Sequence, residues 1–221
     1  MYKTEPHLHV AEISMCSRLK AKEMVKLYKD AGFDTIFISD HFMPAFFDSL
    51  GNIPWEDKIT IFLSGYYKAK AAGEKLGLNV LLSAEVSFDD SPNHYLVYGI
   101  TKEFLIKYPD LCYKGAQHFS EIAKQNDIFV VQAHPFRDGE CFPTLELVDA
   151  IEVYNGSPRH DDRNDDAEIL AKENGLYMTA GSDAHRDEDV AMGGIVTAVP
   201  VTDEIQYIDI IKSKSFDIFK G

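Results

Sequence analysis

The sequence has few of the features that mark secreted, membrane or metal-ribbon proteins. Its three cysteines, Cys16, Cys112 and Cys141, are an odd number with no CxxC spacing, which argues against a disulfide framework and against a zinc ribbon. No stretch of 18 apolar residues occurs, and residues 1–11 lack the apolar core of a signal peptide. We therefore expect a cytoplasmic protein that does not enter a membrane.

Basic residues are also scarce. The chain has 22 Lys and Arg against 36 Asp and Glu, a formal net charge of −14. Proteins that bind a nucleic-acid polymer usually carry basic surfaces, so such a polymer is not the expected partner. A small phosphorylated substrate fits better, because bound divalent cations reverse the local field around an acidic site. The oligomeric state cannot be read from the sequence.

The order of apolar segments predicts a single α/β domain over residues 1–221. This length suffices for one full core, and no Pro/Gly/Ser-rich linker interrupts it. Apolar residues recur at helical spacing in three segments, 21–31, 59–76 and 114–125. Short apolar runs that predict strands lie at 6–10, 35–38, 80–82, 95–98, 128–131, 150–153, 176–179 and 195–199. About seven parallel strand–helix units indicate a barrel, with its active site at the C-terminal ends of the strands.

Four of the predicted helix–strand units share one spacing. A residue suited to a left-handed helix cap stands eight positions before a side chain that can bind a metal. The pairs are Gly32 and Asp40, Gly77 and Glu85, Asn126 and His134, and Gly175 and Asp183. A common strand length explains the spacing but not the residue types at the strand ends. We interpret these side chains as parts of one functional site on the rim of the barrel.

Histidines gather at the same strand ends. His7 and His9 stand at i and i+2 of a predicted strand, so their side chains point the same way, about 7 Å apart, and can share one ion. Asp183 and His185 repeat this spacing. Three further histidines lie at or beside strand ends: His41, His94 and His134. Imidazole and carboxylate donors suit zinc, manganese or iron, and ligand type alone does not choose among these metals.

Asp40 and His41 are neighbours in the sequence, so they cannot share one face of a regular strand. We expect His41 to coordinate a metal and Asp40 to orient a neighbouring group or to accept a hydrogen bond from a histidine ring. Carboxylates often have this role behind metal-bound histidines. Asp40 is therefore a candidate for a role in the chemistry without being a ligand.

The ordered motifs resemble the polymerase and histidinol phosphatase (PHP) family. They are His-x-His near the start, Asp-His after the second strand, a lone Glu after the third, a His before an apolar strand, Ala-His-Pro in the middle and Asp-x-His near the end. They extend from His7 to His185, most of the chain. The resemblance implies a distorted, TIM-like (β/α)7 barrel with a trinuclear metal centre that hydrolyses phosphate esters.

The resemblance also implies a ligand set for two to three divalent ions. One ion would be held by His7, His9, Glu85 and Asp183. A second would be held by Glu85 as a bridge, His94 and His134. The third would take His41, His185 and one further ligand, for which Glu12 is the first candidate and Cys16 the second. Family members often have a His or Asp at this last position, so the third ion depends on a departure from the family pattern.

Phosphate binding requires forked cationic donors. Arg137 follows His134 by three residues and Arg186 follows His185 directly, which places both on the predicted rim. Arg159 and Arg163 lie in the loop after the strand 150–153, and we favour Arg137 and Arg159 as phosphate ligands. His160, in the same loop, is a candidate for protonating the leaving alkoxide.

The predicted function is a metal-dependent phosphoesterase that acts on small-molecule or nucleotide phosphomonoesters. Water bound to a divalent ion ionises near neutral pH, and neighbouring ions stabilise the attacking and leaving oxygens. One alternative is an amidohydrolase-like hydrolase, which also begins with His-x-His and ends on an Asp. Another is a non-catalytic, metal-stabilised structural or regulatory module. The additional rim histidines His41, His94 and His185 argue against the first, and the near-complete ligand set argues against the second.

Overall fold

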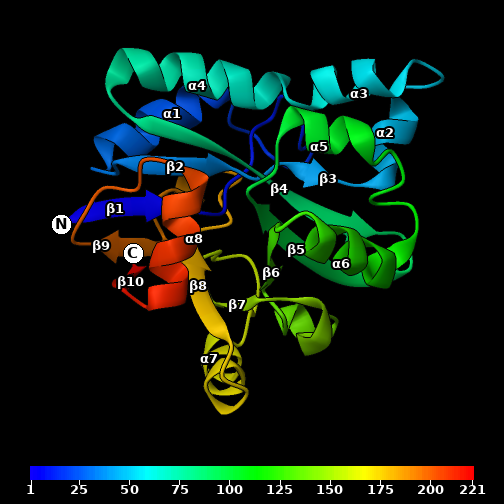
Figure 1. Ribbon diagram of the computed structural model, residues 1–221. Coiled ribbons are helices and arrows are strands. Elements are labelled where there is room, and N and C mark those ends of the chain that lie inside the picture. The colour runs from blue at the N-terminus through cyan, green and yellow to red at the C-terminus, as the bar shows by residue number, and fades with distance from the viewer.

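Ten strands form one curved, mixed β-sheet in the computed structural model, which describes residues 1–221 (Figure 1). The strands are β1 (Tyr2–Glu5), β2 (Thr35–Ile38), β3 (His41–Phe42), β4 (Asn79–Phe88), β5 (Ser91–Tyr98), β6 (Phe129–Ala133), β7 (Ala150–Asn155), β8 (Tyr177–Gly181), β9 (Gly193–Thr197) and β10 (Phe216–Lys220). The helices are α1 (Ala21–Asp30), α2 (Pro44–Ser49), α3 (Trp55–Phe62), α4 (Ser64–Leu76), α5 (Lys102–Lys107), α6 (Gly115–Gln125), α7 (Asn164–Glu173) and α8 (Glu204–Ser213). No helix is long and apolar enough to cross a bilayer.

The sheet is nearly closed into a barrel. Its strand order is β10-β9-β1-β2-β4-β5-β6-β7-β8, with β3 beside β4. The end of β8 returns to the start of β9, where the Ser182 hydroxyl donates to the Gly193 carbonyl and accepts from its N–H at 2.8 Å. A Cβ on Gly193 would collide with the carbonyl oxygen of Gly181, so this approach requires glycine. The α/β barrel-like fold predicted from the sequence is confirmed.

Two strands run against the predicted parallel pattern. β5 is antiparallel to β4 and to β6, and β9 is antiparallel to β1. Only Asp89 and Asp90 separate β4 from β5, and a connection this short can join only antiparallel neighbours. β10 is antiparallel to β9, whereas the neighbours β1-β2-β4 and β6-β7-β8 are parallel, so the C-terminal ends of these six strands share one rim.

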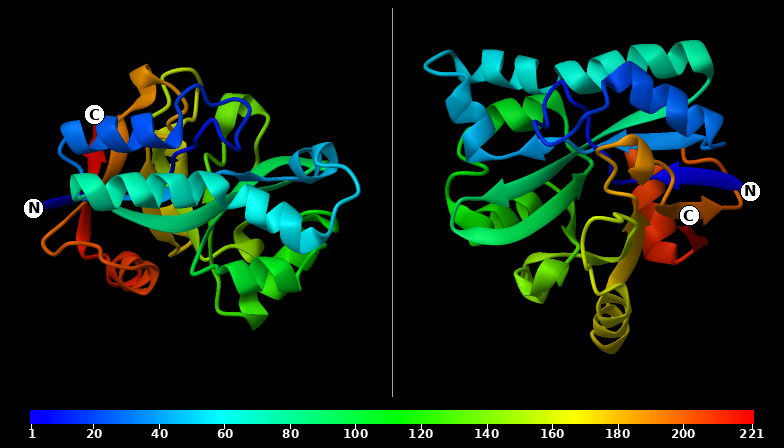
Figure 2. Two further views of the ribbon diagram at one scale, coloured as in Figure 1. Left: turned by 90° about the horizontal axis from the view of Figure 1, so that it is seen from above. Right: turned by 180° about the vertical axis from the view of Figure 1, so that it is seen from behind.

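Helices cover the two faces of the sheet with separate apolar clusters. α1 and α4 lie side by side against one face, and α8 packs on the opposite face (Figure 2). Successive residues of β2 alternate between them: Ile36 and Ile38 belong to the larger cluster and Phe37 to the smaller one. The Phe37 ring packs edge-on against Tyr98 at 5.2 Å and lies 4.8 Å from Tyr207 of α8. This alternation follows from the two-residue period of a strand.

Three local predictions need correction. The first strand ends at Glu5 rather than spanning 6–10, and within that range only Leu8 pairs, in an isolated parallel bridge to Ala184. The predicted helix 59–76 is two helices, α3 and α4, separated at Leu63. Asn126 is not left-handed, because the positive φ of 55° falls on Asp127. The predicted glycine caps do adopt positive φ: Gly32, Gly77 and Gly175.

Candidate metal centre

Four side chains from distant parts of the chain meet in a fully buried first cluster, His7, His9, Glu85 and Asp183. His7 Nε2 lies 3.3 Å from Glu85 Oε1 and 3.3 Å from Asp183 Oδ1. His9 Nε2 lies 3.2 Å from Asp183 Oδ1 and 3.1 Å from His7 Nε2. Ligands bound to one ion at about 2.1 Å are separated by about 3 Å, so these contacts fit a shared divalent ion.

The protons on the two histidines support this assignment. His7 Nδ1 lies 2.8 Å from Glu152 Oε1 and donates to it. His9 Nδ1 donates to the Ser14 hydroxyl at 3.3 Å, because Ser14 donates its own proton to Asp40. Both Nε2 atoms then present lone pairs to each other and to carboxylate oxygens. Burial lowers the pKa of His7, but Asp183, Glu152 and Glu85 outweigh it and raise the pKa well above its usual range, so a positive charge is favoured here. A metal ion can supply that charge in place of the proton.

A second cluster, Glu85, His94 and His134, shares Glu85 with the first. Glu85 Oε1 lies 3.2 Å from His94 Nδ1 and 3.2 Å from His134 Nε2. Several buried polar atoms here form no hydrogen bond, although His41 Nδ1 lies 2.8 Å from Glu85 Oε2: His41 Nδ1, Glu85 Oε2, His94 Nδ1 and His134 Nδ1. Because buried polar atoms are nearly always paired, Glu85 Oε2 and His94 Nδ1 have unused capacity of the kind that a metal ion satisfies.

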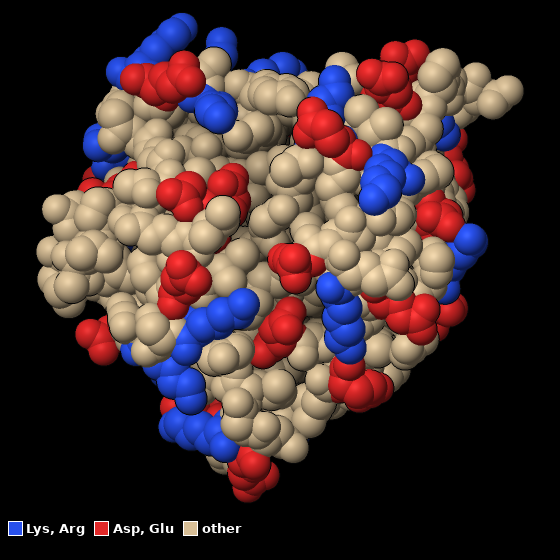
Figure 3. All heavy atoms as spheres, viewed as in Figure 1, with Lys and Arg blue, Asp and Glu red and all other residues tan.

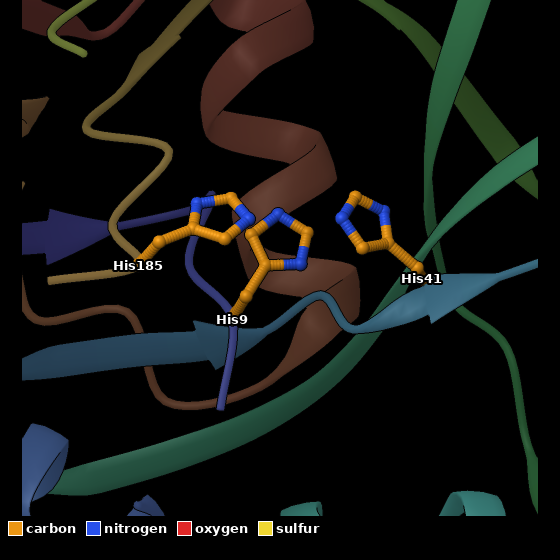
Figure 4. Close-up of side chains that lie close together, drawn as sticks. All are labelled: His9, His41 and His185. Atoms are coloured by element: carbon orange, nitrogen blue, oxygen red, sulfur yellow. The ribbon is translucent and has the colours of Figure 1, made fainter. Parts of the chain in front are cut away.

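A third cluster contains His41, His185 and Cys16, with His9 beside it. In Figure 4 the His9 ring lies between those of His41 and His185, and the ring centroids are 4.3 and 4.2 Å apart. Cys16 Sγ lies 3.2 Å from His41 Nε2. His185 Nδ1 donates to the Asp183 carbonyl oxygen at 2.9 Å, which leaves its Nε2 as a potential ligand. Ligand atoms of His9, His41 and His185 lie within 4.8 Å of one another.

The structure does not bring Glu12 to this cluster. Glu12 Oε2 accepts a hydrogen bond from the Ala21 N–H at 2.9 Å, and its other oxygen lies 3.8 Å from Lys68 Nζ. The carboxylate therefore accepts a hydrogen bond from a backbone N–H that would otherwise be unpaired at the start of α1, where its negative charge also interacts favourably with the helix dipole. Of the two candidates for the third cluster, Cys16 is the one placed there.

The electrostatic environment favours the deprotonated forms of two carboxylates and one thiol in these clusters, Glu85, Asp183 and Cys16. Burial would raise the pKa of Glu85, but His94, His7 and His41 outweigh it and hold the pKa well below its usual range. Burial and the charges of His7 and Arg137 compete in the same way at Asp183, whose pKa is also lowered. At Cys16 burial is opposed by hydrogen bonds with His185 and His41, and the pKa falls to about 6. Two carboxylates and a thiolate are thus available near neutral pH.

Two further acids act through the histidines. Glu152 was not predicted from the sequence. One of its oxygens accepts from the His7 ring, and the other accepts from the backbone N–H of His134 at 3.0 Å. Its signal in the sequence is a single carboxylate within the buried strand β7. Asp40 accepts from the Ser14 hydroxyl at 2.7 Å and so reaches His9 through Ser14 rather than directly. Burial raises the pKa of Asp40 to about 7.

A cavity of about 360 Å³ opens above the clusters, and we call it the arginine cavity. Its lining combines ligands from the clusters with basic residues: Cys16, His41, Glu85, His94, Asp183, His185, Arg137, Arg159, Arg186 and His160. His160 Nδ1 lies 2.7 Å from Asp138 Oδ2. The structure therefore places three of the four predicted phosphate-binding arginines and the predicted acid His160 at one opening.

The arginines differ in how much of their charge is already paired. Arg137 donates to Asp162 and to Asp183 Oδ2, each at 2.7 Å, so it fixes a predicted metal ligand. Arg159 pairs with Asp189, whereas Arg186 lies 3.8 Å from Glu188. Arg163 is not brought to the cavity: it pairs with Asp166 at 2.7 Å and its guanidinium lies over the Phe136 ring. Arg186 is thus the least committed of the three cationic groups.

Charges of both signs are interspersed on the face of the molecule in Figure 3, without a continuous basic surface. This distribution agrees with the net charge of −14.

The comparisons with known proteins concern the C-terminal part and the fold. A family model described as PHP-associated matches residues 161–212, which include α7, β8, β9 and most of α8. A two-domain protein of Bacteroides vulgatus, described as containing a predicted PHP-like metal-dependent phosphoesterase, superposes with a TM-score of 0.72 at 15% identity over 99% of this chain and 64% of that one. The chain has a PHP-like fold.

Other proteins with this PHP-like fold carry different names. A lesion-specific endonuclease of Pyrococcus furiosus matches with a TM-score of 0.64 at 16% identity over 98% of this chain and 57% of that one. An amidohydrolase of Chromobacterium violaceum matches with a TM-score of 0.54 at 17% identity over 85% and 89% of the two chains. No curated protein matches the sequence. The chain spans less than two thirds of the length of the Bacteroides and Pyrococcus proteins. At these low sequence identities, the structural similarities show the fold and not the reaction.

Proposed function

We propose that this chain is a metal-dependent phosphoesterase that hydrolyses phosphate monoesters of small molecules. The observation that carries the proposal is the position of Glu85. Its carboxylate is shared between the first and second clusters, directly beneath a cavity that also holds three arginines. Adjacent cation sites beside guanidinium groups suit a phosphoryl group, whose charge develops on several oxygens at once.

The residues present fit a group of two to three divalent ions. The first cluster would hold one ion, the second cluster another, and His41, His185 and Cys16 a third. Zinc, manganese or iron, once bound there, acidifies a water molecule and polarises the phosphoryl oxygens. Glu152, Ser14 and the Asp183 carbonyl fix the ring orientations of His7, His9 and His185, so the ligand lone pairs are aimed before a metal arrives.

The chain's own side chains supply the remaining functions. Arg186 and Arg159 bind the phosphate oxygens, while Arg137 holds Asp183 in position. His160 donates the proton that the leaving alkoxide needs: with Asp138 on Nδ1, the proton on its Nε2 is the one available to substrate. The products are then an alcohol and inorganic phosphate.

The direct test is hydrolysis of p-nitrophenyl phosphate by protein loaded with Zn²⁺ or Mn²⁺. We expect turnover that disappears with a chelator and in Glu85→Gln, and that persists in Glu168→Gln, a matched change at a surface carboxylate that pairs with Lys172. Turnover in Glu85→Gln with unchanged metal content would contradict the proposal.

Two other functions are separated by the same preparation. An amidohydrolase-like enzyme would cleave C–N substrates such as N-acyl amino acids faster than phosphate esters; the arginines of the cavity favour the phosphate esters. A non-catalytic metal-stabilised module would lose thermal stability on chelation and would hydrolyse neither substrate class.

A further inference from the structure

A second cavity adjoins the arginine cavity and is mostly apolar. Its volume is about 370 Å³, and it shares Cys16, His41 and His94 with the arginine cavity. The rest of its lining is Ile13, Ser14, Met15, Met43 and Phe46. We propose that this apolar cavity binds the alcohol part of the substrate, so that the enzyme acts on phosphate esters of uncharged, mainly apolar alcohols. This inference rests on the proposed phosphoesterase function.

Two polar side chains of the apolar cavity, Ser14 and His41, already contact other protein groups, and a third, His94, lies at the boundary with the arginine cavity. The Ser14 hydroxyl donates to Asp40 at 2.7 Å and accepts from the His41 N–H at 3.2 Å. His41 Nδ1 lies 2.8 Å from Glu85 Oε2, and its Nε2 lies 3.2 Å from Cys16 Sγ. No Lys, Arg, Asp or Glu lines this cavity. A charged or multiply hydroxylated group would therefore lose its water without gaining partners, which is unfavourable.

The apolar cavity has one rigid wall residue, Phe46, and one flexible wall residue, Met15. Phe46 packs against Phe47 and Phe62 at centroid distances of 5.1 and 5.9 Å, which anchors its ring. Met15 is 85% exposed, more than any other large apolar side chain of the molecule. Methionine is flexible and can fold over apolar groups of different shapes.

The position and size of the cavity limit the substrate. Ligand cavities usually measure about 300 to 1,000 Å³, and this one lies at the lower end, enough for one ring or a short alkyl chain. With the phosphate among the arginines, the ester oxygen lies near His41 and His94, where the two cavities meet. The several hydroxyls of a nucleoside would find few partners among Ile13, Met43 and Phe46, so alkyl or aryl esters are favoured over nucleotides.

The test compares two substrates with equal numbers of non-hydrogen atoms and similar leaving groups, pentyl phosphate and 4-hydroxybutyl phosphate. For protein loaded with Mn²⁺, we expect kcat/KM to be at least about tenfold higher for pentyl phosphate, because the terminal hydroxyl would be buried without a partner. In Met43→Gln, which adds an amide to the apolar wall at similar length, this ratio should fall toward one. In Ile205→Gln, at a residue 72% exposed on α8, it should not change.

The outcomes distinguish the preference for apolar alcohols from the phosphoesterase function itself. Hydrolysis of both esters at equal kcat/KM would overturn the inference about the alcohol while the phosphoesterase function stands. If neither ester is hydrolysed, the proposed function fails, and the cavity is then tested by calorimetry with pentylphosphonate and 4-hydroxybutylphosphonate. Tighter binding of pentylphosphonate, reduced in Met43→Gln, would support the apolar cavity; equal dissociation constants would overturn it.

Discussion

The buried carboxylate of Glu152 gives the sharpest prediction about how the site is prepared for metal. One oxygen accepts from His7 Nδ1 at 2.8 Å, and the other accepts from His134 N–H at 3.0 Å and from Asn155 Nδ2 at 2.9 Å. All three contacts need an acceptor. Glu152→Gln keeps the shape of the side chain but leaves only one acceptor oxygen, either for His7 or for the donors of His134 and Asn155.

Either orientation of the amide introduced by Glu152→Gln harms the site. If its NH₂ faces His7, the ring must accept at Nδ1 and carry its proton on Nε2, the atom that faces the first cluster. If the NH₂ faces the other way, it opposes the donors of His134 and Asn155. Loss of such a partner behind a metal-bound histidine typically weakens metal affinity by about 10- to 100-fold, or about 1.4 to 2.7 kcal/mol.

The assay is competition for Zn²⁺ between the protein and a chelator of known affinity. Wild type and the surface variant Glu168→Gln should hold the first ion equally well, and Glu152→Gln should hold it about 10- to 100-fold less tightly. Circular dichroism would verify that all three proteins are folded. A folded Glu152→Gln protein with wild-type zinc affinity would refute the role assigned to Glu152.

Three further predictions concern other parts of the site. In Co²⁺-loaded protein, Cys16→Ser should remove the thiolate-to-cobalt absorption near the ultraviolet and about one bound ion, whereas Cys141→Ser should keep both; an unchanged spectrum would exclude Cys16 as a ligand. His160→Gln should lower kcat for an alkyl phosphate by about 10²-fold or more and for p-nitrophenyl phosphate far less, because p-nitrophenolate needs no proton to leave; equal losses would argue against a general acid. Burial raises the pKa of Glu5 to about 7 against the opposing hydrogen bonds from Ser182 and His7. The contribution of Glu5 to the free energy of unfolding of metal-free protein should therefore be largest below about pH 4.5, and on the order of 3 kcal/mol of it should be lost as pH rises through 7. Denaturant unfolding at several pH values should show this loss in wild type and a smaller one in Glu5→Gln.

The convergence of the site residues was predictable because parallel strands end on one rim. Asp40, Glu85, His134 and Asp183 each follow a buried run, and their strands belong to the parallel sets around β4 and β6–β8. Their arrival at the same end follows from topology and does not require detailed packing. The direction of β5 was not predicted, because the predicted strands 80–82 and 95–98 leave residues 83–94 between them, enough for either direction. Only the extension of β4 to Phe88 and of β5 back to Ser91 leaves the two-residue connection that requires an antiparallel pair.

Local loop conformation and charge pairing were harder to predict. Glu12 and Cys16 lie in one irregular segment, and only its folded path shows that Glu12 turns to the start of α1 while Cys16 faces His41. Arg137 was expected to bind phosphate, but its pairing with Asp162 and Asp183 depends on three separate loops. Glu152 had a sequence signal, a lone carboxylate in an apolar strand, whose meaning rests on the general rule that a buried charge needs a partner.

The most direct test of the account is anomalous X-ray diffraction from crystals of the protein loaded with Mn²⁺ or Zn²⁺, measured on both sides of the metal's absorption edge. The account predicts separate anomalous peaks within the first and second clusters, on either side of Glu85, and a third beside His41, His185 and Cys16. Crystals of well-folded protein that show no peak at Glu85, or peaks only at surface carboxylates, would contradict it.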